Sequence, residues 1–218
     1  LYCFAKAMGM NVEVMGKGKN NKLDYDCNPD TVLEEATRRK MSPKMLCAFK
    51  DGTKTMVEMT AMSNYTGLVP DVIGGHGPET APGTEGIKQL NDIFKLKEDG
   101  GILNKHGVVE YVNGVAPGVF VTVSTPNDEI AYQMGYHSMG PGPLWTLYRP
   151  YHLCNLETPL TVAKLVIDQE TTCVPIDGLV SECITRAKVD LKAGQVIDGI
   201  GGYTTHGSIC SAEESDKN

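Results

Sequence analysis

The pattern of apolar and polar positions predicts its clearest helix in the middle of the chain. Methionines recur at every third position across residues 56–62, after an Asp-Gly turn at residues 51–52. That spacing is typical of one buried helical face, and Gly67 supplies a stop at its C-terminal end. The apolar run at residues 45–49 favours a short buried strand before the turn. We therefore expect a strand, a turn and a helix in succession, which is where α/β enzymes commonly place polar chemistry.

Further elements follow from the same reading of the remaining residues. The chain starts in a helical apolar stripe that stops at Gly9, and alternation then predicts a strand. Strands are expected at residues 11–15, 108–112, 119–123 and within 180–209, helices at 30–39, 87–94 and 156–167, loops at 16–29 and 69–86, and a polar tail from residue 211. The order predicts an α/β plus β fold, with a doubly wound sheet followed by a small all-β unit.

Length and composition narrow the classes of protein that the chain can represent. Its 218 residues are enough for one large or two small domains. A net charge of -7 without long basic runs argues against a nucleic-acid partner, and no apolar run approaches the length of a membrane span. Seven cysteines without a Cys-x-x-Cys pair are typical of reduced thiols, so we expect a cytoplasmic protein.

The predicted central helix carries the candidate catalytic groups. Lys54 and Glu58 share one face of it, and Asp51 lies beside its first free amides. A lysine flanked by two carboxylates is suited to proton transfer. Alternatively, Lys54 and Glu58 form an ordinary surface pair worth about 0.3–0.5 kcal/mol. The residues alone leave both interpretations open.

A second candidate follows the first predicted strand. Gly16, Lys17 and Gly18 resemble half of a phosphate-binding glycine fingerprint but lack its third glycine. This segment is either a flexible loop or the edge of a ligand site. His76 stands among glycines in the loop of residues 69–86, where it is either a ligand contact or an exposed mobile histidine.

Basic residues in two other places are candidates for binding an anion. Lys105 stands just before the strand at residues 108–112. Arg149 and His152 lie in an aromatic cluster that holds the only tryptophan, and Arg149 is a candidate anion clamp. An arginine stacked among rings beside a core histidine needs no ligand, which is the alternative.

Several segments together are similar to a known family. They are residues 49–59 with 64–67, 95–104, 115–121, 147–153 and 190–194. Through them the chain closely resembles the homoserine-dehydrogenase-like oxidoreductases that end in a SAF domain, a family that includes an enzyme resembling deoxyxylulose-phosphate reductoisomerase in activity. The resemblance implies four parts: residues 1–41 as the C-terminal remnant of a Rossmann NAD(P)-binding domain, 42–170 as a central catalytic and oligomerisation region, 171–210 as a SAF-like β-clip unit and 211–218 as a polar tail.

The resemblance also implies a function. The expected activity is NAD(P)-dependent oxidation or reduction of a small hydroxylated or phosphorylated substrate by a homo-oligomer. By similarity, Lys54 exchanges a proton with the substrate oxygen, and Asp51 or Glu58 sets its charge state. Substrate-binding roles fall to Lys105, Arg149, His152 and Asn64, and cofactor-binding roles to Gly16, Lys17 and Gly18. The alternative is a non-catalytic module, with the SAF unit recognising a carbohydrate-like ligand and the rest serving assembly.

One departure from the family limits these expectations. The family's glycine-rich dinucleotide loop lies upstream of the counterpart of Leu1, which here is already inside a helical pattern. We therefore expect a fragment that by itself binds the nicotinamide cofactor poorly and turns over little. Because zinc-type His and Cys spacings are missing, a metal would be Mg²⁺ or Mn²⁺ held by carboxylates, with Glu58 and Asp51 as candidates.

Overall fold

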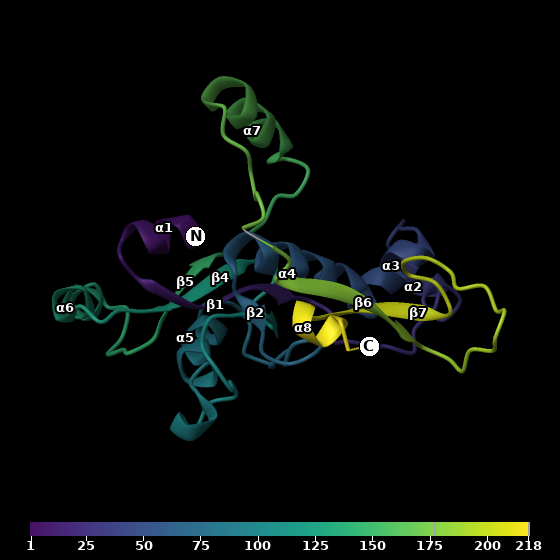
Figure 1. The fold of residues 1–218 in the computed structure, drawn as a ribbon, viewed down its shortest axis with the longest axis horizontal. Helices are drawn as coiled ribbons and strands as arrows, with labels where there is room; N and C mark the ends of the chain where they lie inside the picture. The colour runs from purple at the N-terminus through teal and green to yellow at the C-terminus, as the bar shows by residue number, and fades with distance from the viewer. Residues whose placement is uncertain (177, 218) are drawn as a thin grey trace.

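A five-stranded mixed sheet forms the centre of the computed structural model, which describes residues 1–176 and 178–217 (Figure 1). The strand order is β2-β3-β1-β4-β5. The strands are β1 (Asn11–Lys19), β2 (Val69–Pro70), β3 (Val108–Asn113), β4 (Val119–Ser124) and β5 (Trp145–Arg149). β1 pairs parallel with β3 and antiparallel with β4. The α/β class is confirmed, although the sheet is mixed rather than uniformly parallel.

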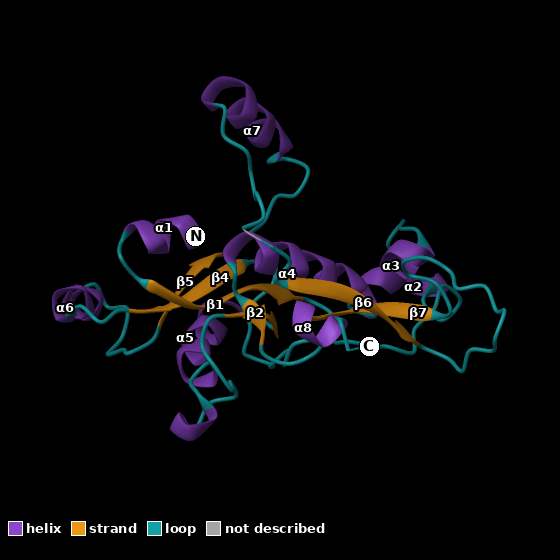
Figure 2. Ribbon diagram, viewed as in Figure 1, coloured by secondary structure: helices purple, strands orange, loops and turns teal. Residues whose placement is uncertain are grey.

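Helices cover this sheet and extend from it (Figure 2). They are α1 (Tyr2–Ala7), α2 (Leu33–Arg38), α3 (Pro43–Lys50), α4 (Thr53–Thr66), α5 (Gly83–Ile93), α6 (Asp128–Tyr136), α7 (Thr158–Ala163) and α8 (Ala212–Ser215), with a 3-10 turn η1 (Lys97–Asp99) and a π-helical turn η2 (Lys164–Asp168). None of the helices in the described part combines the length and apolar character that crossing a membrane requires.

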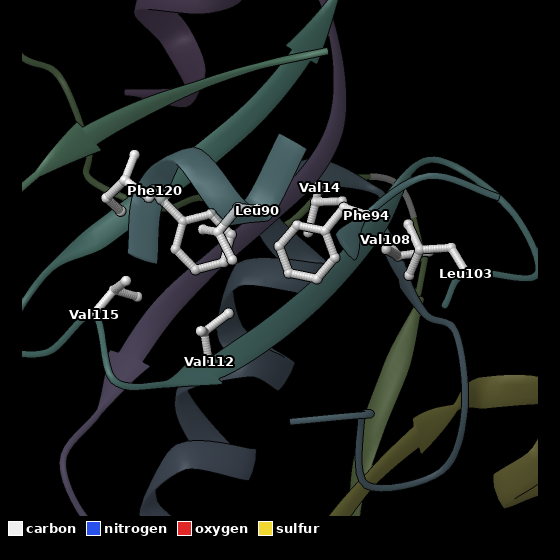
Figure 3. Close-up of a cluster of buried hydrophobic side chains, with 9 residues drawn as sticks. Val14, Leu90, Phe94, Leu103, Val108, Val112, Val115 and Phe120 are labelled. Atoms are coloured by element: carbon white, nitrogen blue, oxygen red, sulfur yellow. The ribbon is translucent and has the colours of Figure 1, made fainter. Parts of the chain in front are cut away.

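Alternation along β3 divides the core between the two faces of the sheet. Val108 and Val112 pack with Phe94 at the end of α5, and Phe94 stacks on Phe120 with ring centroids 5.7 Å apart (Figure 3). The intervening Val109 joins α4 and the C-terminal strand in another cluster. Successive side chains of a strand point to opposite faces, so α5 and α4 cover opposite sides of the sheet.

A second, two-stranded antiparallel sheet contains β6 (Ser181–Ala187) and β7 (Thr205–Ser211). It lies along α4, where Ile209 packs against Met56 and Met59 (Figure 1). The expected small β unit is therefore present near the C-terminus, with a loop across residues 188–204. The polar tail expected from Ser211 instead begins with the short helix α8, which Ser211 and Glu214 cap reciprocally.

Several sequence predictions are confirmed by these elements. The central helix ends before Gly67, which adopts a left-handed φ of +80° as a C-terminal stop. The strands expected at residues 108–112 and 119–123 are β3 and β4. Alternation over a few residues and a three-residue repeat are local signals, so both elements could be recognised without knowledge of their neighbours.

The strand predicted at residues 45–49 is wrong, because this segment belongs to helix α3. Pro43 occupies the first turn of α3, where its fixed φ suits a helix and its missing N–H costs nothing. Leu46 and Cys47 then bury one side of the helix against Val32 and Ala36. A short apolar run is compatible with either structure, and packing selects the helix.

The loop predicted from residue 16 is also wrong at its start, because β1 continues to Lys19. A Cβ on Gly16 would lie 2.1 Å from the carbonyl oxygen of Glu110, and one on Gly18 would lie 2.4 Å from that of Val115. Only glycine permits such close contact between backbones. These glycines therefore serve strand packing, whereas residues 20–29 form no helix or strand.

The helical pattern at residues 156–167 is confirmed by α7 and η2, but its apolar stripe is not buried within the chain. Leu156 is 75% exposed and Ile167 is 77% exposed. Figure 1 shows this segment projecting away from the sheets on extended connections. The boundary expected at residue 41 stays a prediction, although β1 from the first expected domain lies between β3 and β4.

Candidate active site

A cavity of about 490 Å³ opens at the C-terminal end of β1. Its walls come from β1 and the residues after it, from α3 and α4, and from the segment that follows β5. Among the residues lining it are Lys17, Lys19, Lys54, Glu58, Phe49 and His152. We call it the lysine cavity. The carboxyl ends of strands are a common position for ligand sites in α/β folds.

Lys19, the last residue of β1, has the most unusual environment in this cavity. It is only 6% exposed, and its Nζ donates a 2.7 Å hydrogen bond to the carbonyl oxygen of Phe49 at the end of α3. Burial, helped by the neighbouring Lys17 charge, lowers the pKa of Lys19 to about 8, although Asp51 acts in the opposite direction. Lys19 therefore exchanges its proton much closer to neutral pH than an ordinary lysine does.

Lys17 and Glu58 form an ion pair that joins β1 to α4. The Lys17 side chain is 12% exposed and that of Glu58 is 43% exposed. Glu58 therefore neutralises one ammonium group of the lysine cavity while remaining accessible to solvent. The sequence suggested that Glu58 pairs with Lys54 on the same helix. In the structure it pairs instead with Lys17 on β1.

Lys54 and His152 contribute to other parts of the cavity wall. The Nζ of Lys54 lies 4.6 Å from the centroid of the Phe49 ring, in a cation–π contact. His152 Nδ1 lies 3.3 Å from the Sγ of Cys154, and both residues line the cavity. The structure thus brings together five of the residues selected from the sequence: Lys17, Gly18, Lys54, Glu58 and His152.

Two other predicted site residues do not line the cavity and instead hold the fold together. Asp51 is fully buried, and its Oδ2 lies 2.7 Å from the Nζ of Lys188. Asn64 accepts hydrogen bonds from the backbone N–H groups of Val180 and Ser181 and donates to the Ser181 carbonyl. Its amide therefore fixes the start of β6. These contacts account for both side chains without a ligand.

The remaining predicted substrate-binding residues also lie outside the lysine cavity. Arg149 pairs with Glu157 and lies over the Tyr151 ring, 4.5 Å from its centroid. That arrangement matches the alternative of an arginine stacked against an aromatic ring. Lys105 is exposed and does not line the cavity. His76 is held by Asp71, with 2.7 Å between His76 Nε2 and Asp71 Oδ2.

The residues proposed as metal ligands do not fit a metal site. Glu58 pairs with Lys17, and Asp51 is buried against Lys188. Across residues 1–176 and 178–217, no group of three His, Cys, Asp or Glu side chains is placed to hold a metal ion. We therefore assign no chemistry to a metal in this cavity.

The glycines proposed for cofactor binding do not fit a dinucleotide cradle either. The space beside Gly16 and Gly18 is filled by the backbone of Glu110 and Val115. A phosphate-binding glycine loop requires its backbone amides to face open space. Gly18 and Lys17 do line the lysine cavity, so this stretch contributes to the site through its lysines.

Lys19 is the site residue that the sequence analysis missed. The alternation of glycine and lysine in residues 16–19 carried a usable signal, because alternate residues of a strand share one face. Reading this segment as a strand would have placed Lys17 and Lys19 together, with the glycines on the opposite face. Interpreting the glycines as loop formers concealed that pattern.

The chain matches a known protein family. Residues 1–158 match the family model described as "Oxidoreductase DRL, catalytic domain". The matched segment covers most of the chain and includes the residues that line the lysine cavity. No curated protein matches the chain.

Proposed function

Because the chain belongs to the family of oxidoreductase DRL catalytic domains, we propose that the lysine cavity is the substrate site of an NAD(P)-dependent oxidoreductase. The substrate in this proposal is a small hydroxylated or phosphorylated molecule. The supporting observation is the convergence of Lys17, Lys19 and Lys54 on one cavity, where Glu58 is the one carboxylate among the described lining residues. This excess of positive charge favours an anionic substrate.

Lys19 has the central chemical role in this proposal. An amine with a pKa of about 8 can both hold and release a proton near neutral pH, as proton transfer to a substrate oxygen requires. Its bond to the Phe49 carbonyl fixes the direction from which the proton is exchanged. This assignment moves the acid–base role from Lys54 to Lys19.

Lys54 and Lys17 orient the substrate. Lys54, held over the Phe49 ring, attracts a carboxylate or phosphate group into the cavity. Lys17 adds a charge that Glu58 partly offsets. Hydride transfer belongs to the nicotinamide cofactor, and we assign no step of it to Gly16 or Gly18.

The test is turnover by the full-length protein with NADH or NADPH and candidate hydroxylated or phosphorylated substrates. Lys19→Met is expected to lower kcat by about 10²- to 10⁴-fold, the usual contribution of a general acid–base group. Lys105→Met is the matched control, because it removes an exposed lysine outside the cavity, and it is expected to leave kcat within about twofold. Equal activity of Lys19→Met and the parent protein would refute the proposal.

A further inference from the structure

A buried ion pair joins the residue after β6 to the junction between α3 and α4, two helices that contribute residues to the lysine cavity. Lys188 directly follows β6 and lies outside the family match, whereas Asp51 lies between α3 and α4 and inside it. Their side chains are 1% and 0% exposed, and Nζ and Oδ2 are 2.7 Å apart. An unpaired charge at such a depth would be strongly destabilising. Each group therefore depends on the other for a compensating charge.

Lys188 is well suited to this role because its ammonium group is surrounded by acceptors. Besides Asp51, its Nζ donates to the carbonyl oxygens of Cys27 and Gly202, at 2.8 and 3.1 Å, and lies 3.4 Å from the Sγ of Cys47. Burial by itself lowers the pKa of Lys188, but its hydrogen bond to Asp51 and the charge of Asp51 outweigh it and leave that pKa raised. Lys188 therefore stays charged at neutral pH.

Asp51 transmits this interaction to the wall of the cavity. Its Oδ1 accepts a 2.9 Å hydrogen bond from the Thr53 N–H at the start of α4, and its own N–H donates to the Cys47 carbonyl at the end of α3. Phe49 lies between Cys47 and Thr53 in the chain, and its carbonyl oxygen accepts the hydrogen bond from Lys19. The orientation of that carbonyl is thus tied to the junction that Asp51 fixes.

We propose that Lys188 is a positioning residue for the lysine cavity: it holds the Asp51 carboxylate in a buried ion pair, and Asp51 fixes the α3–α4 junction and supplies the negative charge that acts on Lys19. The inference rests on the function proposed above. It implies that the catalytic segment of residues 1–158 depends on a residue that follows β6. A catalytic domain cut before β6 would leave Asp51 without this cation.

The charges around Lys19 predict in which direction its pKa changes when Lys188 is replaced. Lys17 on β1 lowers the pKa of Lys19, while Asp51 and, to a smaller extent, Cys27 raise it against the dominant effect of burial. On β7, the pKa of His206 also responds to Asp51 and Lys188, although burial is the main cause of its lowering. Without Lys188, the buried Asp51 carboxylate has no cation to compensate it, and the folded protein is not expected to keep that charge beside Lys19. Lys19 would then lose its supporting negative charge and titrate at a lower pH.

The experiment measures the titration of Lys19 directly in the full-length protein. Acetic anhydride acetylates only unprotonated amines, so acetylation of the Lys19 peptide is followed by mass spectrometry as a function of pH. The parent protein is expected to show a midpoint near pH 8. Lys188→Met is expected to lower that midpoint by roughly one pH unit, the scale of losing a nearby opposite charge. Asp51→Asn is expected to lower the midpoint of Lys19 acetylation by the same amount.

Two further variants separate this role from general loss of stability. Asn64→Ala removes another attachment of β6 without touching Asp51, so it is expected to leave the Lys19 midpoint unchanged. Asp51→Asn combined with Lys188→Met removes both buried charges, which proteins often tolerate, and is expected to shift the midpoint as far as either single change. This double variant provides the test if the single variants fail to fold.

An unchanged midpoint in Lys188→Met or in the folded double variant overturns the inference, as does an equal shift in Asn64→Ala. The outcome is independent of turnover. If Lys19→Met keeps full activity while Lys188→Met shifts the midpoint, the proposed function fails and the coupling stands. If Lys19→Met abolishes activity but Lys188→Met leaves the midpoint of Lys19 acetylation unchanged, the coupling between Lys188 and Lys19 fails and the proposed function stands.

Discussion

Lys17 on β1 and Glu58 on α4 form an ion pair at the wall of the lysine cavity. The pair joins residues that the sequence suggested for two different roles, one in cofactor binding and one in catalysis. The other two lysines of the cavity, Lys19 and Lys54, have no carboxylate partner among the described ion pairs. The described lining of the cavity therefore has an excess of positive charge, which Glu58 reduces by one.

Replacing Glu58 with Gln is expected to strengthen the binding of a simple anion. The change releases Lys17 from its partner, and because Glu58 is partly exposed the gain is limited to about two- to fivefold in affinity. Calorimetric titration with inorganic phosphate at low salt measures it. Glu98→Gln, which removes an exposed carboxylate in η1, is the control with no expected change. Weaker phosphate binding by Glu58→Gln would contradict a purely electrostatic role.

Replacing Gly16 with Ala is expected to reduce the free energy of unfolding by about 1–3 kcal/mol, the usual effect of overpacking. The new methyl group would lie 2.1 Å from the Glu110 carbonyl oxygen and 2.6 Å from the Phe120 ring. Gly199→Ala is the control, because its Cβ would have no atom within 4 Å. Urea denaturation compares the two. A stable Gly16→Ala protein with weakened cofactor binding would restore the cofactor-binding interpretation.

Replacing Asn64 with Ala is expected to weaken the attachment of β6 to α4. Two backbone N–H groups, of Val180 and Ser181, lose their acceptor, and unsatisfied groups of this kind cost about 1–3 kcal/mol. Gln133→Ala removes an exposed bond to Glu129 within α6 and should change the free energy of unfolding by no more than about 0.5 kcal/mol. Hydrogen exchange of β6 amides measures the local effect. Unaltered β6 protection in Asn64→Ala would be inconsistent with this anchoring role.

Lys19 is expected to make stability increase with pH in the alkaline range. Its pKa of about 8 in the folded protein lies below the ordinary value of 10.5, so between these pH values the unfolded chain binds a proton that the folded chain has released. Stability therefore rises with pH across that window. The free energy of unfolding of the parent protein, measured against Lys19→Met, is expected to increase from pH 7 to pH 10. If the difference in the free energy of unfolding between the parent protein and Lys19→Met stays constant with pH, Lys19 has an ordinary pKa.

Part of the fold could be predicted from the sequence because its signals are local. The methionine repeat of α4 and its glycine stop describe a helix with one buried face, and the apolar runs of β3 and β4 describe strands. The same local reading failed at residues 45–49, where Pro43 and the packing of Leu46 produce a helix. A five-residue apolar run does not contain enough turns to distinguish the two periodicities.

The sequence by itself determined the oxidoreductase family, the central helix and the position of Lys54 and Glu58 on it. Tertiary structure decided which charges meet: Lys17 on β1 with Glu58 on α4, and Asp51 with Lys188, which follows β6. It also decided that Lys19 is buried, which lowers its pKa to about 8. The physical reason is that helix and strand periodicity is set by neighbouring residues, whereas burial and ion pairing depend on segments that only the folded chain brings together.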